Sequence, residues 1–155
     1  LVWHFIGPIQ SNKTKRISEL FDWVHSVDRM KVATRLNEFR PADQIPLNIL
    51  LQVNIDNEES KAGIQVDEIG SMAQSISTLK NLRLRGLMAI PRKNDDPEQQ
   101  RLPFIRMRQA LDKLQVTYPQ CDTLSMGMSN DLQTAIAEGS TLVRIGTAIF
   151  GTRLT

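Results

Sequence analysis

Strand-like and helix-like segments alternate along this chain from its first residues to its last. Short apolar runs with the composition of β-strands fall at residues 2–6, 23–26, 47–55, 82–90, 123–125 and 142–145. The stretches between them place apolar side chains three or four residues apart, which is the spacing of an amphipathic helix. This alternation predicts an α/β fold with a parallel sheet, because each helix carries the chain back to start the next strand in the same direction.

The helical segments are marked by their apolar faces and by their ends. A helix is expected over residues 12–21, with Ile17, Leu20 and Phe21 on one face. Asp28 is expected to cap the next helix, since a short polar side chain can accept hydrogen bonds from the first turn. The remaining helices are marked by Val32, Leu36 and Phe39, by Val66, Ile69, Ala73 and Ile76, by Phe104, Met107, Leu111 and Leu114, and by the segment 130–137.

Two forms of the sheet are compatible with this alternation. One is an open, doubly wound sheet, and the other is a (β/α)8 barrel of the TIM type. A barrel uses eight strand–helix units and about 250 residues, whereas this chain of 155 residues shows six strands. On the barrel interpretation, residues 1–155 form a single domain that lacks its first two strand–helix units. The pattern alone does not choose between the two forms.

Composition and charge exclude several classes of function. Hydrophobic residues make up 41% of the chain and charged residues 23%, the balance of a soluble globular domain. The formal net charge is +2 without long single-sign blocks, so neither a nucleic-acid-binding surface nor a polybasic membrane patch is expected. No apolar run approaches the ~20 residues of a membrane span. The lone Cys121 is expected to be an ordinary thiol in a reducing compartment, so we expect a cytoplasmic protein.

Two short segments near the C-terminal end have the composition of phosphate-binding turns. They read Ser125-Met-Gly-Met-Ser-Asn-Asp131 and Arg144-Ile-Gly-Thr-Ala-Ile-Phe-Gly151, and each follows a short apolar run. Glycine and small hydroxyl residues at such a junction let backbone N–H groups approach an anion, and barrels often build a phosphate site from the loops after their last two strands. Ser129, Gly146 and Thr147 are therefore the candidate phosphate ligands. The alternative is that both turns are ordinary helix caps.

Four other side chains stand at or near predicted strands. Arg144 precedes the glycine of the second turn by two residues, where a ring attached to the phosphate would lie. Lys61 follows the strand 47–55, and it could meet an anionic ligand or stand free in solvent. His4 and His25 lie in successive strands and are expected to approach each other, but they lack the spacing of a zinc site. Supporting roles are expected for both, with His4 the better candidate near a ligand ring.

The order of several motifs along the chain is similar to that of a known family. Trp3-His4-Phe5-Ile6-Gly7 is followed by Gln10-Ser11-Asn12-Lys13, by Ser60-Lys61-Ala62-Gly63, by Gly86-Leu87-Met88-Ala89-Ile90-Pro91 and by the two turns. Over its full length, the chain resembles the YggS/PROSC family of pyridoxal-phosphate-binding proteins. The two turns are the specific part of this resemblance.

The resemblance implies a fold, a cofactor and a role. The implied fold is a single barrel similar to the N-terminal domain of alanine racemase, and the implied cofactor is pyridoxal 5′-phosphate (PLP). The Schiff-base lysine of the family would lie before Leu1, in the two missing units. Arg144 matches the family's contact to the pyridine nitrogen, and Met128 and Ser129 match its phosphate turn. The implied role is PLP homeostasis in vitamin B6 metabolism: holding the cofactor and passing it on, with apo PLP enzymes as acceptors.

Two enzymatic alternatives remain. An amino-acid racemase of the alanine type needs bases on both faces of its substrate, and alanine racemase takes a tyrosine base from a second domain of the partner subunit. The only tyrosine here, Tyr118, is predicted to lie far from the site. An aldolase- or isomerase-like barrel would need paired carboxylates at strand ends, and the sequence shows none. We therefore expect a monomeric PLP-binding protein with no catalytic residues and no metal site.

Overall fold

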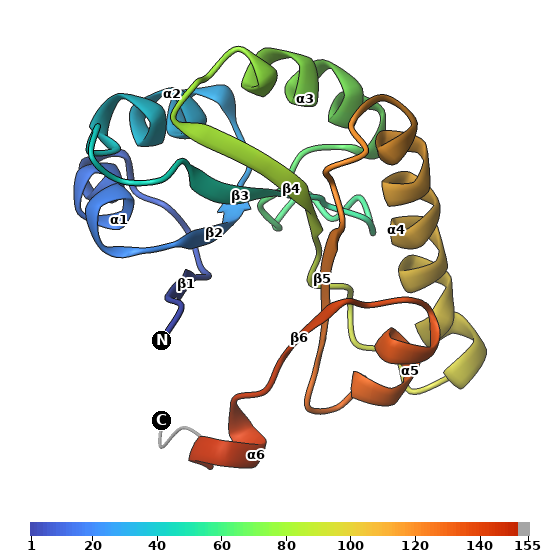
Figure 1. Ribbon diagram of the computed structural model, residues 1–155. Helices are drawn as coiled ribbons and strands as arrows, with labels where there is room; N and C mark the ends of the chain where they lie inside the picture. The colour runs from blue at the N-terminus through green and yellow to red at the C-terminus, as the bar shows by residue number, and fades with distance from the viewer. Residues whose placement is uncertain (152–155) are drawn as a thin grey trace.

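The computed structural model describes residues 1–151, which form one six-stranded sheet with helices around it (Figure 1). The strands are β1 (His4–Phe5), β2 (Trp23–Val27), β3 (Leu47–Gln52), β4 (Leu82–Met88), β5 (Thr123–Met128) and β6 (Leu142–Arg144). The helices are α1 (Thr14–Leu20), α2 (Met30–Phe39), α3 (Ile69–Ser77), α4 (Pro97–Thr117), α5 (Leu132–Ala137) and α6 (Thr147–Phe150), with 3-10 turns η1 (Ser11–Lys13) and η2 (Val66–Glu68) before α1 and α3. The alternation predicted from the sequence is confirmed.

The order of the strands decides how the sheet is wound. Each strand pairs in parallel with the next one in sequence, from β1 to β6, without a reversal. A doubly wound sheet needs a point at which the strand order reverses, so that alternative is wrong. The sheet instead curls, with helices α1 to α5 on its outer side (Figure 1). The curl is tight enough for His25 on β2 to hydrogen-bond Ser125 on β5 across the inner face, although these strands are not neighbours.

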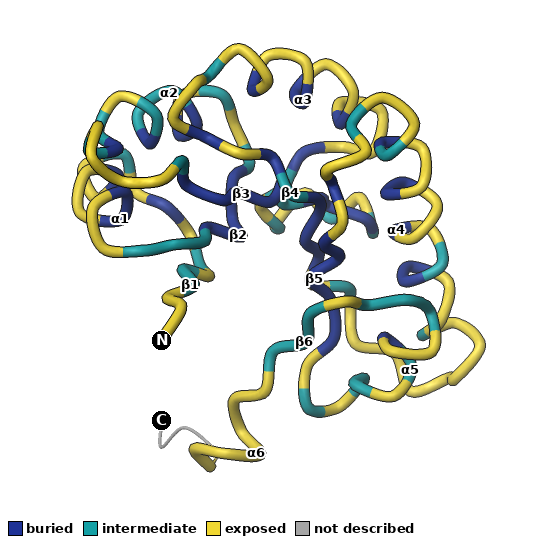
Figure 2. The backbone as a smooth tube through the Cα atoms, viewed as in Figure 1, coloured by how far each residue is buried: buried dark blue, intermediate teal, exposed yellow. Residues whose placement is uncertain are grey.

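The main hydrophobic core lies between the sheet and the helices. Leu47, Ile49 and Leu51 of β3 belong to this core, together with buried residues of the surrounding helices. Successive side chains of a strand point to opposite faces, so Asn48 and Leu50 lie on the inner face. Nearly the whole of β3 is buried (Figure 2), which explains its near-continuous apolar sequence. The inner face also takes polar side chains, and these build the site described below.

Several local predictions are wrong. Val66, expected on the apolar face of a helix, is 44% exposed and lies in η2 before α3. Arg29 rather than Asp28 occupies the N-cap position of α2, and the Asp28 carboxylate instead accepts a hydrogen bond from the Arg29 guanidinium at 2.6 Å. Leu20 is 56% exposed rather than packed, since the short helix α1 ends at that position. The first strand is shorter than residues 2–6, because only His4 and Phe5 pair with β2.

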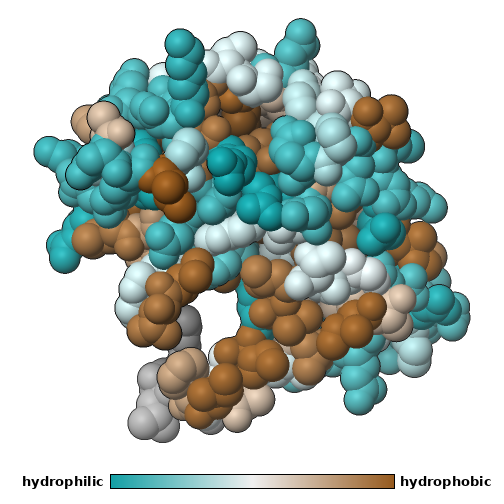
Figure 3. All heavy atoms as spheres, in the orientation of Figure 1, coloured by the Kyte–Doolittle hydropathy of each residue, from teal (hydrophilic) through white to brown (hydrophobic). Residues whose placement is uncertain are grey.

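Apolar side chains are exposed near both edges of the sheet. Val2 and Trp3 are exposed beside β1, and Ile149 and Phe150 are exposed beyond β6. Apolar residues gather on this side of the molecule in the space-filling view (Figure 3). Among residues 1–151, the outer edges of β1 and β6 have no strand partner. The described part of the sheet is therefore an open arc.

Candidate functional site

The two turns meet at one cavity of about 760 Å³ at the ends of β5 and β6. Its lining consists of Met128, Ser129, Asn130, Arg144, Gly146, Thr147, Phe150 and Gly151. The turns also touch directly, because the Thr147 hydroxyl donates a hydrogen bond to the Ser129 hydroxyl oxygen at 3.2 Å. The structure thus brings together the residues that the sequence analysis assigned to a phosphate.

Asp131 and Gly127 hold the first turn in place. Asp131 is the N-cap residue of α5, and its carboxylate accepts a hydrogen bond from the Met128 N–H at 2.6 Å. Gly127 has a φ of 94°, and a Cβ atom at this position would overlap the Ala135 methyl group. Strand β5 therefore packs closely on α5 only because residue 127 has no side chain. This packing sets where Ser129 lies in the cavity.

The turns present hydrogen-bond donors that the rest of the fold does not use. Within residues 1–151, no acceptor pairs with the backbone N–H groups of Asn130, Gly146 and Thr147. Peptide N–H groups and hydroxyls that converge on one cavity can bind an anion such as a phosphate. The residues present therefore fit a phosphate group.

Arg144, the last residue of β6, holds its guanidinium against the neighbouring strands. Nη1 donates to the Ser125 carbonyl at 2.9 Å and to the Ser125 hydroxyl at 2.7 Å, and Nη2 donates to the Ala89 carbonyl at 2.9 Å. A guanidinium has five N–H donors, so its Nε–H and one Nη2–H have no partner within residues 1–151. Burial lowers the pKa of Arg144, and the charge of Asp131 opposes this effect. The group nevertheless stays protonated at any ordinary pH.

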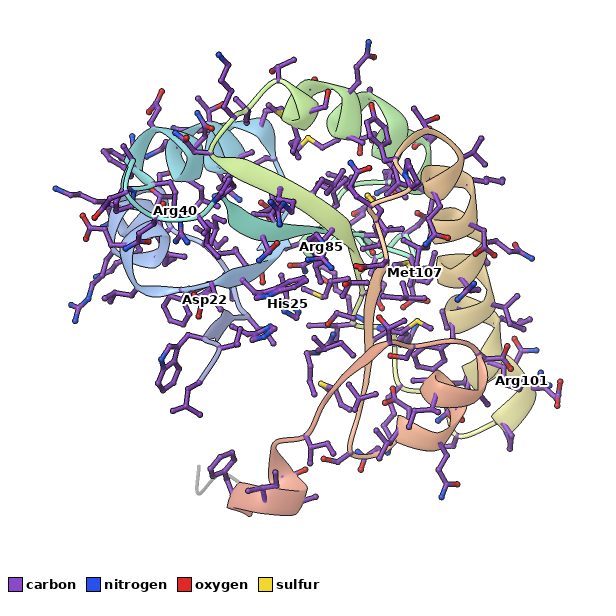
Figure 4. The ribbon with its side chains drawn as sticks, viewed as in Figure 1. Asp22, His25, Arg40, Arg85, Arg101 and Met107 are labelled. Atoms are coloured by element: carbon purple, nitrogen blue, oxygen red, sulfur yellow. The ribbon has the colours of Figure 1, made fainter. Side chains whose placement is uncertain are left out.

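A continuous chain of hydrogen bonds runs from Arg144 across the inner face of the sheet. The Ser125 hydroxyl lies 2.9 Å from His25 Nδ1, and His25 Nε2 lies 2.8 Å from His4 Nδ1. The His4 ring stacks on Trp23 with the ring centroids 5.4 Å apart. His25 lies on the inner side of the curled sheet (Figure 4). The predicted approach of the two histidines is confirmed, whereas the link to Arg144 through Ser125 was not predicted, because no sequence signal places β2 against β5.

Both histidines are held in the neutral form. Burial lowers the pKa of His25 to about 3, and repulsion from His4 and Arg144 contributes to the shift. Burial also lowers the pKa of His4, against the opposing effect of the Asp22 carboxylate. At physiological pH each ring therefore carries one hydrogen, and its two nitrogens act as one donor and one acceptor.

Lys61 reaches the end of β4 from the loop that follows β3. Its ammonium pairs with Glu58 at 2.7 Å and with Asp56 at 3.9 Å, and it donates to the Ile90 carbonyl at 3.4 Å. Ile90 directly follows Ala89, whose carbonyl accepts a hydrogen bond from the Arg144 guanidinium. Lys61 is therefore held by carboxylates near the ligand-facing end of the sheet rather than standing free in solvent.

The other residues considered from the sequence lie away from this site. Cys121 is buried just before β5, and burial raises the pKa of its thiol to about 12, so it is no nucleophile at neutral pH. Tyr118 follows α4 and packs against the main core. Residues 1–151 contain no cluster of three His, Cys, Asp or Glu side chains placed to hold a metal ion. Among the described helices, none combines the length and apolar character needed to cross a membrane.

Several known proteins are similar in sequence to this chain over most of its length. Residues 2–154 match the family described as alanine racemase, N-terminal domain. The pyridoxal phosphate homeostasis protein of Escherichia coli (strain K12) is 54% identical over 153 residues, which cover 99% of this chain and 65% of that protein. The protein of the same name from Pseudomonas aeruginosa is 56% identical with the same coverage. This chain thus spans slightly less than two thirds of the length of these relatives.

Solved structures share the fold. PipY of Synechococcus elongatus without PLP matches with a TM-score of 0.89 and 35% identity, covering 97% of this chain and 71% of PipY. The structure of PipY with PLP bound matches with a TM-score of 0.86, 34% identity and the same coverage.

Fold and site together define a class of protein: a singly wound, curled parallel α/β sheet with donor-rich turns after two neighbouring strands. Within this class, the chain belongs to the alanine racemase N-terminal domain family. The resemblance to the YggS/PROSC proteins is confirmed by the homeostasis relatives and by PipY.

Proposed function

We propose that this protein binds pyridoxal 5′-phosphate and serves PLP homeostasis by holding the cofactor and passing it on. The observation that carries the proposal is the junction of the two turns. The Ser129 and Thr147 hydroxyls are 3.2 Å apart, and Arg144 lines the same cavity. The PLP-bound structure of PipY and the names of the homeostasis relatives support this ligand.

The phosphate and the ring are assigned to different residues. Ser129, Gly146 and Thr147 offer hydroxyl and N–H donors to the phosphate oxygens. Arg144 offers its remaining N–H groups to the ring nitrogen, and Met128 lines the same cavity. When bound, PLP supplies an aldehyde to which amines add and a ring that withdraws electrons.

Lys61 and His4 are assigned supporting contacts. Lys61 is paired with Glu58 at 2.7 Å, and on parting from that carboxylate its ammonium can meet an anionic ligand or its amine can hold PLP transiently. His4 lies at the outer end of the hydrogen-bond chain that begins at Arg144. Neither residue is assigned a catalytic role.

The guanidinium of Arg144 selects the protonation state of the ring nitrogen. Arg144 can only donate hydrogen bonds, so a ring nitrogen in contact with it must be an unprotonated acceptor. Such a ring withdraws electrons less strongly than a pyridinium paired with a carboxylate. The contact therefore fits a carrier or a racemase-like site better than an aminotransferase. The position of Tyr118, which packs against the main core and is not among the residues lining the cavity, counts against the racemase.

The curled sheet is assigned to a single (β/α)8 barrel domain that is larger than residues 1–155. The unbroken parallel strand order, the open arc and the 65% coverage of the relatives support this assignment. None of the six strands in residues 1–151 carries a lysine. The Schiff-base lysine is accordingly assigned to a strand outside this chain.

Substitutions in the two turns test the phosphate assignment. Ser129→Ala is expected to weaken binding of pyridoxine 5′-phosphate by about 1–2 kcal/mol, the scale of one charge-assisted hydrogen bond. Thr147→Pro is expected to weaken it at least as much, because it removes both the backbone N–H and the hydroxyl of residue 147. Pyridoxine 5′-phosphate has no aldehyde and cannot bond covalently to a lysine. The dissociation constant measured by calorimetry therefore reflects only the noncovalent contacts, including those of the two turns.

Ser77→Ala is the matched control, since Ser77 is exposed on α3 and is not among the residues lining the cavity. It is expected to leave the dissociation constant unchanged. Unchanged affinity in both turn variants would mean that the turns are only helix caps.

Cofactor transfer tests the homeostasis role. PLP-loaded protein mixed with an apo PLP enzyme is expected to restore that enzyme's activity, whereas loaded protein given L-alanine is expected to show no rapid racemisation. The ultrafiltrate of the loaded protein serves as the control for free PLP. The proposal places this exchange in the cytoplasm, between a monomer and its acceptor. Vigorous racemisation would instead identify the protein as an enzyme.

A further inference from the structure

Four side chains from four strands form a single hydrogen-bonded chain across the inner face. His4 on β1, His25 on β2, Ser125 on β5 and Arg144 on β6 are joined by successive contacts of 2.8, 2.9 and 2.7 Å. His25 and Ser125 are fully buried, while His4 is partly exposed. The phosphate contacts proposed above use none of the first three residues.

At neutral pH the hydrogen bonds that join these four side chains are all donated in the same direction, from Arg144 toward His4. Arg144 can only donate, so the Ser125 hydroxyl oxygen accepts from it. Within residues 1–151 this hydroxyl contacts only Arg144 and His25, so its proton is satisfied by donation to His25 Nδ1. Neutral His25 then carries its hydrogen on Nε2 and donates it to His4 Nδ1. His4 keeps its own hydrogen on Nε2.

Protonation of His4 reverses these bonds. The His4 cation carries hydrogens on both nitrogens, so its Nδ1–H must donate to His25 Nε2. His25 stays neutral, and its one hydrogen now sits on Nδ1 and donates to the Ser125 oxygen. That oxygen then accepts from both His25 and Arg144, and its own proton has no acceptor within residues 1–151. In this form the four hydrogen-bonded side chains carry one more proton, which comes from solvent. Because the Ser125 hydroxyl proton is left without an acceptor, the contact between Ser125 and Arg144 is weakened.

We propose that His4, His25 and Ser125 are positioning residues for Arg144 and form a relay through which the protonation of His4 sets how firmly the guanidinium is held. The inference rests on the proposed function for the ligand that Arg144 contacts. The relay itself is a property of the protein without ligand.

The surroundings of His4 contain groups of both signs. The Asp22 carboxylate raises the pKa of His4, against the larger effect of burial. Trp23 stacks on the ring, and the Arg85 guanidinium lies 4.9 Å from the centroid of the Trp23 ring. Arg85 is itself paired with Asp122 at 2.6 Å, so its charge is partly balanced. His4 is thus the member of the relay that exchanges protons with solvent.

Nitrogen NMR of the histidine rings in the full, ligand-free protein tests the relay directly. At about pH 8, well above the ordinary histidine pKa, both rings are expected to carry their hydrogen on Nε2. As the pH falls and His4 titrates, His25 is expected to move its hydrogen to Nδ1 with the same midpoint while remaining neutral. A His25 tautomer that stays constant through the titration of His4 would overturn the proposal.

Ligand affinity provides the second readout. His4→Phe keeps an aromatic ring against Trp23 but cannot be protonated, and His4→Gln serves if that variant does not fold. On acidification, the wild-type protein is expected to lose roughly five- to tenfold more affinity for pyridoxine 5′-phosphate than the variant, the scale of one hydrogen bond. Comparison at equal pH cancels the titration of the ligand itself. An equal loss in both proteins would contradict the relay.

Inorganic phosphate separates this inference from the proposed function. Its binding needs only the two turns, so wild type and variant are expected to lose affinity for it equally. If neither phosphate nor pyridoxine 5′-phosphate binds at any pH, the proposed function is wrong. The tautomer of His25 in the ligand-free protein then decides the relay by itself.

Discussion

Acidification from pH 6.5 to about pH 5 is expected to lower the free energy of unfolding by about 2 kcal/mol through His25 alone. The fold holds the pKa of His25 at about 3, against an ordinary value of 6.5, because burial penalises the charged ring. Between these values the unfolded chain binds a proton that the folded chain does not. This stability is therefore present above pH 6.5 and is lost by about 1.4 kcal/mol per pH unit as the pH falls toward 3.

Urea unfolding at a series of pH values measures this slope. His25→Gln is the informative variant, because its amide can still form hydrogen bonds with His4 and Ser125 but cannot titrate. Whatever its stability at neutral pH, the plot of its free energy of unfolding against pH is expected to be flatter than that of the wild type below pH 6.5. Parallel profiles for the two proteins would show that His25 is not the source of the acid sensitivity.

Gly127→Ala is expected to destabilise the protein by about 2–4 kcal/mol, through backbone strain and overpacking together. The backbone at Gly127 has a φ of 94°, and the new methyl group would overlap that of Ala135 on α5. Displacement of α5 also moves the turn that Asp131 closes, so binding of pyridoxine 5′-phosphate is expected to weaken. Denaturant unfolding measures the first effect and calorimetry the second.

Two further variants separate strain from overlap. In an Ala135→Gly background, the cost of Gly127→Ala is expected to fall, because the overlapping methyl group is absent and only the strained φ remains. Gly70→Ala on α3 is the control, since nothing lies within 4 Å of its added methyl. It is expected to stabilise by about 0.5–1 kcal/mol, as alanine does in a helix interior. An unchanged cost in the Ala135→Gly background would show that close packing on α5 is not the reason for Gly127.

Local patterns predicted the elements of the fold. The apolar run at 47–55 and the stripe at 104–114 correspond to β3 and α4, because burial on one or both faces leaves a period in the sequence. The errors occurred at the ends of helices and at the edge strand β1. Asp28 was assigned as a cap, whereas its carboxylate interacts with Arg29, and such competition between neighbouring side chains has no periodic signature.

The candidate site was predictable only in part. The two turns were recognisable because glycine and hydroxyl residues stand at strand ends, and the structure places Ser129 and Thr147 3.2 Å apart. Ser125 was missed, since a serine within an apolar strand is unremarkable by itself. Its partners, His25 and Arg144, lie 100 and 19 residues away in sequence.

The sequence by itself determined which segments become strands and helices and where the glycine-rich turns stand, because these depend on side-chain periodicity and backbone freedom within a few residues. The tertiary structure decided the winding of the sheet and the meeting of residues across its inner face. The alternation of strands and helices is compatible with a doubly wound or a curled sheet, and the unbroken order of the strands excludes the doubly wound form. That curl brings His25 of β2 within hydrogen-bonding distance of Ser125 of β5. His4, His25, Ser125 and Arg144 are thereby joined by successive hydrogen bonds.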